Sequence, residues 1–177
     1  MRPRAEGTNR SSALFERQTG ALGERVRAAR TARGWSQQSL SNHTEIDRAN
    51  ISRIEGGKQN ITLEVLWRLA NVLQLHWADL LDDRIRETPR TRRPQRPFKI
   101  QLSAFGVRAY EARALQRISQ QALADQTGIG RSTISGIEDG TQNITLETLS
   151  RLAAGLHLHW ADLLDDRKTD PPRPAPR

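Results

Sequence analysis

Apolar residues recur along much of this chain at intervals of three and four positions, the spacing that places them on one face of an α-helix. Two leucine stripes show this spacing most clearly: Leu63, Leu66, Leu69 and Leu73, and then Leu146, Leu149, Leu152 and Leu156. The alternation of apolar and polar residues that is typical of a half-buried strand is missing. The pattern therefore predicts an all-α fold.

The two stripes resemble each other because most of the chain is duplicated. The segment that starts at Ser36 aligns without a gap to the segment that starts at Ser119, and about two-thirds of the aligned positions are identical. A weaker match extends towards the N-terminus, from Gly23 and Gly106. The sequence thus predicts two tandem copies of one domain of about 65 residues.

Each copy is predicted to contain five helices. In the first copy, helix 1 covers about 22–33, helix 2 is capped by Ser36, helix 3 covers about 47–55, helix 4 is capped by Thr62, and HWADLLDD forms helix 5. The counterparts in the second copy are about 105–117, a helix capped by Ser119, 130–138, a helix capped by Thr145, and a second HWADLLDD. Trp77 and Trp160 are expected to close the core.

The predicted domains span residues 21–84 and 100–167 and are joined by a basic, proline-rich linker at 85–99. Its prolines break helices and its arginines repel one another, so we expect it to join the domains without fixing their arrangement. The arm at 1–20 and the tail at 168–177 have low apolar content and are expected to be disordered.

The formal net charge is +8, which makes a polyanion the first partner to consider. The linker carries six basic residues and one acidic residue, whereas 100–167 has six basic and eight acidic residues. Charge alone leaves open whether these basic flanks bind nucleic acid or are solvated. The absence of cysteine excludes disulfides and thiolate chemistry, and no apolar run approaches the roughly 20 residues that span a membrane. We expect a cytoplasmic protein without membrane contact.

A spaced pattern runs through both copies: Gln at the start of helix 2, Leu three residues on, Ile in the turn, and I-S-x-I-E-x-G through helix 3. This pattern resembles the phage-repressor-like helix-turn-helix family (Cro/XRE, lambda-repressor-like) over almost all of both repeats. The resemblance implies sequence-specific binding of double-stranded DNA and transcriptional regulation, here as a repressor, with helix 3 of each repeat in the major groove.

The resemblance also implies which residues contact DNA. In the first copy they are Gln37, Gln38, Asp47, Arg48, Ala49, Asn50, Ser52, Arg53, Lys58 and Asn60. In the second copy they are Gln120, Gln121, Arg131, Ser132, Thr133, Ser135 and Asn143. Among them, Gln37 and Gln120 match phosphate-contacting positions, and the residues of helix 3 match base-facing positions.

Physical reasoning supports part of this set. Arg48 and Arg131 lie near the N-terminus of helix 3, where the helix dipole disfavours a cation, so a bidentate bond to guanine would explain them. A solvated surface arginine is the alternative, as is an intrahelical pair for Arg53. Asn60 and Asn143 either contact phosphate or shape the turn before helix 4.

The two copies differ where the family pattern matters. The second copy has the usual Ala124 and Gly128 around the turn, whereas the first has Ser41 and Glu45, so a slightly altered turn is expected there. The second copy has Gly130 and Gly136 where the first has Asp47 and Arg53. We therefore expect the first domain to dominate specificity.

The sequence offers little for functions other than DNA binding. We expect no catalysis, no cofactor and no metal, because the four histidines lack metal-ligand spacing and Gly128-Ile-Gly130 lacks the strand and third glycine of a dinucleotide site. The tandem Asp pairs at 82–83 and 165–166 are interpreted as exposed helix ends. An antitoxin-type protein that binds a partner protein and autoregulates its operon is the alternative function, and a homodimer is a further possible partner.

Overall fold

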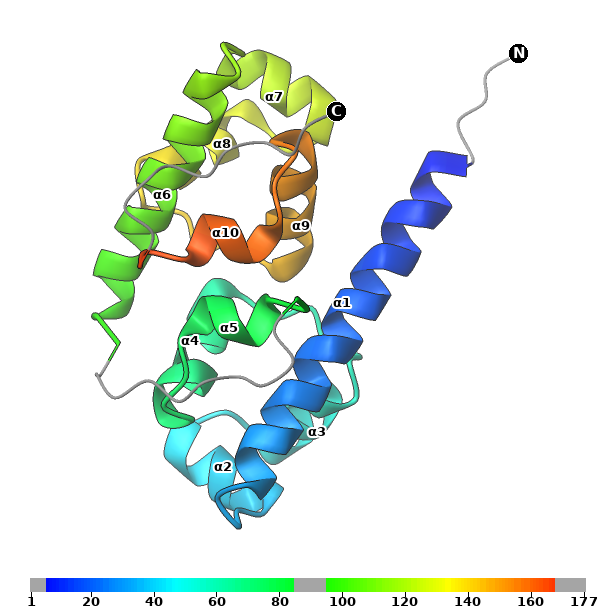
Figure 1. Ribbon diagram of the computed structural model, residues 1–177, viewed down its shortest axis with the longest axis vertical. Coiled ribbons are helices and arrows are strands. Elements are labelled where there is room, and N and C mark those ends of the chain that lie inside the picture. Colours follow the sequence, from blue (N-terminus) through cyan, green and yellow to red (C-terminus); the bar gives the residue numbers. More distant parts are fainter. Residues whose placement is uncertain (1–5, 85–94, 168–177) are drawn as a thin grey trace.

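The computed structural model describes residues 6–84 and 95–167, with the side chains of 6–12 and 14 left out. Its helices in the first repeat are α1 (Glu6–Thr31), α2 (Gln37–Thr44), α3 (Arg48–Glu55), α4 (Leu63–Val72) and α5 (Trp77–Leu81). Those in the second are α6 (Phe98–Leu115), α7 (Gln120–Thr127), α8 (Arg131–Glu138), α9 (Leu146–Gly155) and α10 (Trp160–Leu164). The described residues form five helices per repeat, so the predicted all-α fold is confirmed (Figure 1).

The caps that begin these helices are the predicted ones. The hydroxyl of Ser36 accepts a hydrogen bond from the amide of Ser39 at 3.0 Å, and Ser119 does the same for Ala122. Thr62 and Thr145 cap α4 and α9 in the same way. Side-chain caps of this kind satisfy amides that have no partner within the helix, which fixes where each helix starts.

The expected disorder of residues 1–20 is wrong from Glu6 onward, because α1 begins there and runs without interruption to Thr31. Its middle, from Phe15 to Thr19, packs on both domains. Thr19 is buried, Phe15 packs against the core, and the Ser150 hydroxyl donates to Gln18 Oε1 at 3.3 Å. These tertiary contacts stabilise a helix that composition alone does not predict.

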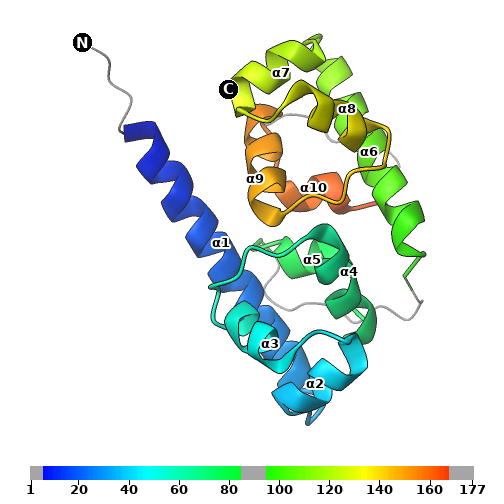
Figure 2. The same cartoon turned by 180° about the vertical axis from the view of Figure 1, so that it is seen from behind.

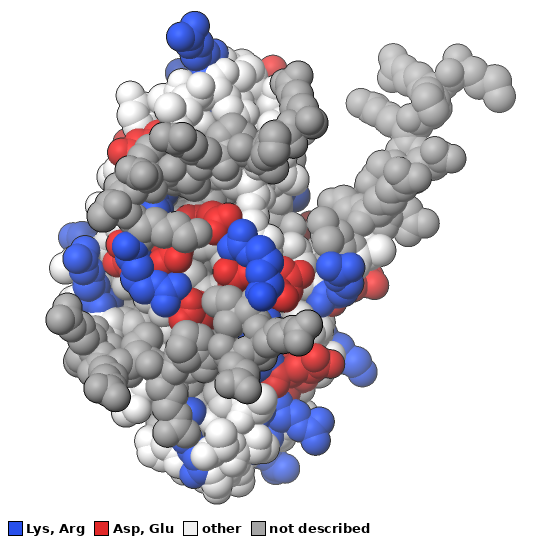
Figure 3. Space-filling view, in the orientation of Figure 1, with Lys and Arg blue, Asp and Glu red and all other residues white. Residues whose placement is uncertain are grey.

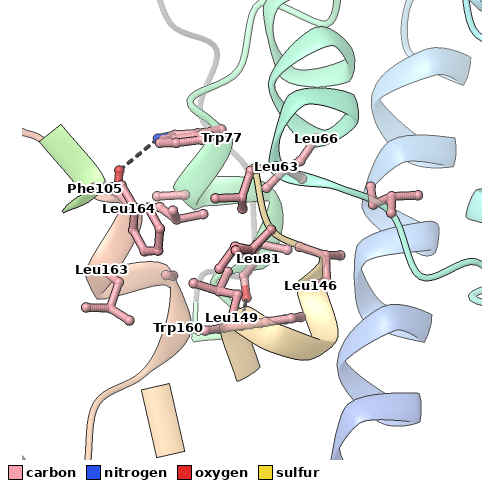
Figure 4. Close-up of a cluster of buried hydrophobic side chains, with 14 of the residues drawn as sticks. Leu63, Leu66, Trp77, Leu81, Phe105, Leu146, Leu149, Trp160, Leu163 and Leu164 are labelled. Carbon is pink, nitrogen blue, oxygen red and sulfur yellow. Dashed lines mark hydrogen bonds between the residues drawn. The ribbon is translucent and has the colours of Figure 1, made fainter. Parts of the chain in front are cut away.

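Each domain has a leucine-rich core closed by a tryptophan. The leucine stripes of α4 and α9 are buried, as are Trp77 and Trp160, which are only 1% and 2% exposed. The prediction that these two tryptophans close the core is confirmed. Unexpectedly, the two cores are continuous with each other (Figure 4).

The domains pack together through α5 and α10, so the expectation that the linker leaves their arrangement free is wrong. The indole Nε1 of Trp77 donates to the Leu164 carbonyl at 2.8 Å, and Trp160 Nε1 donates to the Leu81 carbonyl at 2.9 Å. All five residues of α5 are buried. A short helix buried on every side has no solvent face, so it needs the second domain for its stability.

Ion pairs surround this contact in two equivalent sets. Arg84 binds Asp162 at 2.8 Å, and Arg167 binds Asp79 at 2.5 Å. Two histidines complete the sets: His76 Nε2 lies 2.8 Å from Asp166, and His159 Nε2 lies 3.0 Å from Asp83. The second aspartate of each tandem pair, Asp83 or Asp166, thus has a cross-domain partner and is not simply an exposed helix end, whereas Asp82 and Asp165 pair with Arg84 and Arg167 of their own repeat.

Every one of these contacts recurs with the two repeats exchanged, which means that a pseudo-two-fold axis relates the domains. The long helices α1 and α6 lie on opposite sides of the central pair α5 and α10 (Figure 1). Two domains related by a two-fold axis form an isologous interface, the arrangement that a homodimer usually has. Here one chain supplies both halves.

The end of the predicted linker is part of the fold. Gln95 donates to the Leu75 carbonyl at 2.6 Å, and Trp67 Nε1 donates to the Arg96 carbonyl at 3.1 Å. The helix α6 then begins at Phe98, seven residues before the predicted start, and Phe98 contacts the Trp67 ring. The rest of the linker (85–94) and the tail (168–177) lie outside the described residues, so the predictions for them are not tested.

Candidate nucleic-acid interface

The turn between α2 and α3 has the same conformation in both repeats. Glu45 has a left-handed backbone with φ 56° and ψ 27°, and Gly128 has φ 64° and ψ 20°. The expectation of an altered turn in the first repeat is therefore wrong. Since a residue with a Cβ is strained in this region, Glu45 stores backbone strain that Gly128 avoids.

The inner side of α3 is fixed by close packing. Ile51 and Ile54 are buried, and a Cβ on Gly23 of α1 would lie only 2.5 Å from the Ile54 carbonyl oxygen. Gly106 of α6 approaches the end of α8 in the same manner. These glycines bring the first helix of each domain against α3 or α8, which leaves the outer side of α3 and α8 free to project.

A buried network supports α3 and α8 from their C-terminal ends. Arg30 Nε lies 2.5 Å from Glu55 Oε1, and Gln37 Nε2 donates to Glu55 Oε2 at 3.0 Å. Burial disfavours the ionised form of Glu55, but the hydrogen bonds from Arg30 and Gln37 outweigh it and hold the pKa of Glu55 below its usual value. The carboxylate therefore stays charged and keeps the end of α3 tied to α1 and α2.

The second repeat contains the same network. Arg113 Nε lies 2.6 Å from Glu138 Oε1, and Gln120 Nε2 donates to Glu138 Oε2 at 2.9 Å. Burial opposes ionisation of Glu138 as well, and the hydrogen bonds of Arg113 and Gln120 again leave its pKa lowered. An amide NH₂ has two hydrogens, so Gln37 and Gln120 each keep one that could reach a phosphate.

Five of the ten DNA contacts predicted for the first repeat are in α3, and a sixth, Asp47, is its N-cap. Arg48, Ala49, Ser52 and Arg53 are exposed, and Asn50 is half-buried and accepts a bond from Arg53 at 3.3 Å. Asp47 has a structural task too, since its carboxylate caps α3 by accepting from the Ala49 amide at 2.7 Å. The structure thus brings one basic, hydrogen-bonding surface together on α3.

The outer side of α8 is less charged. Arg131 and Ser132 are exposed, whereas Thr133 and Ser135 are half-buried. Gly130 takes the capping position without a side chain to cap with, and Gly136 leaves the position of Arg53 empty. Arg131 is the one basic residue of this helix.

The helices α3 and α8 lie on the same face of the molecule. Figure 2, which views the structure from behind, shows α3 and α8 on the near side, each in front of the long first helix of its domain. The opposite face has acidic and basic groups side by side across its middle, where the ion pairs of α5 and α10 lie (Figure 3). The two faces therefore offer different chemistry.

The remaining predicted contacts are in or beside these elements. Gln38 and Gln121 are exposed on α2 and α7 and bond within their own helices, to Asn42 and Asp125. Lys58 is exposed in the loop after α3. Asn60 and Asn143, by contrast, form hydrogen bonds across the domain boundary. The sequence predicts either phosphate contact or shaping of the turn before helix 4 for them, and neither prediction includes these bonds.

One group of potential metal ligands was missed by sequence reasoning. Asp82, Asp83 and His159 each place a ligand atom within 4.8 Å of the others, and they come from different repeats. Arg84, however, already bonds both carboxylate oxygens of Asp82, at 2.7 and 2.8 Å. The ion pairs account for this cluster without a metal. In the described residues, no helix combines the length and the apolar character needed to cross a membrane.

The chain is similar to known proteins over both repeats. The helix-turn-helix family model HTH_3 matches residues 26–80 and again residues 110–163. A similar solved structure is that of the restriction-modification controller protein C.AhdI from Aeromonas hydrophila, at 34% identity. The match covers 36% of this chain and 97% of that one, with a TM-score of 0.36. A search of curated proteins found no significant match.

Proposed function

The chain belongs to the helix-turn-helix family of Cro/XRE type and is a DNA-binding transcription regulator, and we propose that it reads the major groove of a specific operator with α3 and α8 as a repressor. The observation that carries the proposal is the presentation of two exposed recognition helices on one face by a pseudo-two-fold axis (Figure 2). Recognition helices related in this way enter successive major grooves, about one helical turn or roughly 34 Å apart. The operator then has two half-sites in inverted orientation.

One chain is sufficient for both half-sites. The surface that would pair with a second chain in a homodimer is occupied by the other repeat, through the Trp77 and Trp160 contacts. The half-sites differ in sequence, because α3 and α8 carry different side chains at three of their eight positions. The first domain dominates specificity, since Arg53 has no counterpart in α8.

Selection of bound duplexes from a random library tests the proposal. The expected result is one sequence with two unequal, inverted halves at a fixed spacing, bound by a single chain. Chemical-shift mapping with that duplex should then place the DNA on α3 and α8. Failure to enrich any sequence, or a contact surface away from both helices, would contradict the proposal.

A second function, binding of a partner protein by an antitoxin-type regulator, is favoured by one feature of α6. Ile100, Val107 and Tyr110 are 49%, 51% and 52% exposed. Their counterparts on α1 are charged: Arg17, Glu24 and Arg27. The fold therefore does not need this apolar stripe.

Exposed Lys99 and Arg117 lie near the two ends of the stripe, so the partner that fits is an apolar surface with acidic residues at its rim. Val107→Glu, which copies α1, should abolish binding of the product of a neighbouring gene in a purified mixture and leave DNA affinity unchanged. Unchanged partner binding, or no partner binding by the wild type, would contradict this second function.

A further inference from the structure

A short bridge between the repeats lies beside the recognition helices. The amide of Leu63 donates to the Ile144 carbonyl and the amide of Leu146 donates to the Ile61 carbonyl, both at 2.9 Å. Thr62 and Thr145 face each other in this two-stranded contact. The loops that follow α3 and α8 thus meet each other directly.

Two asparagines extend the bridge on either side. Asn60 Nδ2 donates to Glu147 Oε2 at 3.1 Å while its Oδ1 accepts from the Glu147 amide at 3.2 Å. Asn143 makes the same two contacts with Glu64, both at 3.2 Å. Each asparagine therefore satisfies an amide at the start of the other domain's fourth helix, as an N-cap residue does within one domain. We call these four residues the Asn clamp.

Only short loops connect the Asn clamp to the C-terminal ends of α3 and α8. The amide of Lys58 donates to the Arg53 carbonyl at 2.9 Å, which holds the loop against the last turn of α3. The amide of Thr141 donates to the Gly136 carbonyl at 2.9 Å in the second repeat. If either asparagine is displaced, the C-terminal end of α3 or α8 therefore moves with it.

We propose that Asn60 and Asn143 are positioning residues that hold α3 and α8 at one separation and so set the spacing of the two DNA half-sites. This inference rests on the proposed DNA-binding function. Each asparagine uses its Oδ1 and one of its two amide hydrogens across the domain boundary, so in this proposal the clamp acts through the placement of other side chains. The sequence Q-N-I-T-L-E is identical in the two repeats, so each copy supplies one half of a symmetric contact.

The test uses the full chain with Asn60→Ala and Asn143→Ala together. Affinity is measured for the selected operator and for duplexes in which the halves are moved by one or two base pairs. The wild type should discriminate against shifted duplexes, and the variant should lose about two- to tenfold of that discrimination, the range that one net hydrogen bond supplies. Gln59→Ala with Gln142→Ala, in the same two loops, is the matched control and should keep it.

A second measurement is independent of DNA. The chain has no cysteine, so Asn42→Cys on α2 and Asp125→Cys on α7, which are equivalent exposed positions, can carry spin labels. Dipolar spectroscopy should give a narrow distance distribution that broadens in the Asn60→Ala, Asn143→Ala variant. Glu64→Gln with Glu147→Gln, which keeps an acceptor for each asparagine, should leave the distribution narrow.

The outcomes separate the alternatives. Equal loss of affinity at every spacing with an unchanged distance distribution would overturn the inference and favour phosphate contact by Asn60 and Asn143. An unchanged distribution together with unchanged discrimination would also overturn it. If the wild type selects no operator, the proposed function fails, while a distribution that broadens in the variant still supports the clamp.

Discussion

The recognition helices α3 and α8 have almost the same geometry and different chemistry. Both are eight residues long, both end at a glutamate held by an arginine and a glutamine, and both present an arginine at their first position. Yet α3 is capped by Asp47 and carries Arg53, whereas α8 is capped by Gly130 and carries Gly136. The two repeats thus share the buried Arg–Glu–Gln network that holds this helix and differ in the side chains that the helix exposes. The network and the exposed side chains can therefore be tested separately.

The largest expected effect comes from breaking the shared support. Glu55→Gln and Glu138→Gln should each destabilise the protein by about 2–4 kcal/mol, because a guanidinium would lose its ionised partner in a buried site. Denaturant unfolding measures the loss. Nearly equal losses would mean that the two supports are equivalent, and a loss at one site alone would contradict that.

The carboxylates of Glu55 and Glu138 also predict how the free energy of unfolding changes at acidic pH. Their folded pKa values lie below the ordinary value of 4.5, so the stabilisation is complete above that pH and declines as the pH falls through the folded pKa. Unfolding free energies measured from pH 6 to pH 2 should fall less steeply in Glu138→Gln than in the wild type. Equal slopes would contradict the assignment.

The next effect concerns the arginine that both helices share. Arg48→Ala should weaken binding to the selected operator by about 1–3 kcal/mol and hardly change binding to random DNA, as expected for a bidentate contact to guanine. Arg131→Ala should do the same in the other half-site. Binding titrations over a salt series separate the two contributions. Equal losses on specific and random DNA would exclude base reading by that arginine.

A smaller effect follows from exchanging the residue that differs most. Arg53→Gly should lower affinity severalfold, and Gly136→Arg should raise it and steepen the salt dependence by about one unit. The new side chain must displace Gln142, whose Cγ lies 3.0 Å from the added Cβ, but a flexible side chain can move. If Gly136→Arg changes neither affinity nor salt slope, then this position does not face DNA in the second repeat.

The smallest effect distinguishes the two turns. Glu45→Gly should stabilise the chain by about 0.5–1 kcal/mol, because glycine adopts φ 56° without strain. Gly128→Ala should destabilise it, since the added Cβ would also lie 2.9 Å from an Arg151 nitrogen. Thermal unfolding of both variants provides the comparison. A destabilised Glu45→Gly would mean that the Glu45 side chain makes a contribution larger than the strain.

Much of the fold follows from local sequence. Ser36, Thr62 and their counterparts begin helices because their hydroxyls cap exposed amides, and the leucine stripe of α4 has one possible burial face. The exposed residues of α3 could be named for the same reason, since Ile51 and Ile54 fix which side is buried. Local spacing is sufficient for features that depend on a single helix.

Features that depend on the second domain were missed. Nothing local in Asn60 indicates that its partner is Glu147, eighty-seven positions away. A signal for the interface does exist in HWADLLDD, because Trp77, Leu80 and Leu81 are too many large apolar residues for a five-residue helix to bury on a single face. The middle of α1 gives no such signal, since Thr19 is buried by the tertiary fold and Gln18 is bonded by the distant Ser150.

The internal pairing of α5 with α10 has a consequence for dosage. When a regulator must dimerise before it binds DNA, its operator occupancy at low abundance depends on the square of its concentration. Occupancy therefore falls steeply when the protein is diluted. A chain that contains both DNA-binding domains needs no dimerisation step before it binds. Its operator occupancy at low abundance is then simply proportional to copy number. A few molecules per cell then act with the same efficiency per molecule as many.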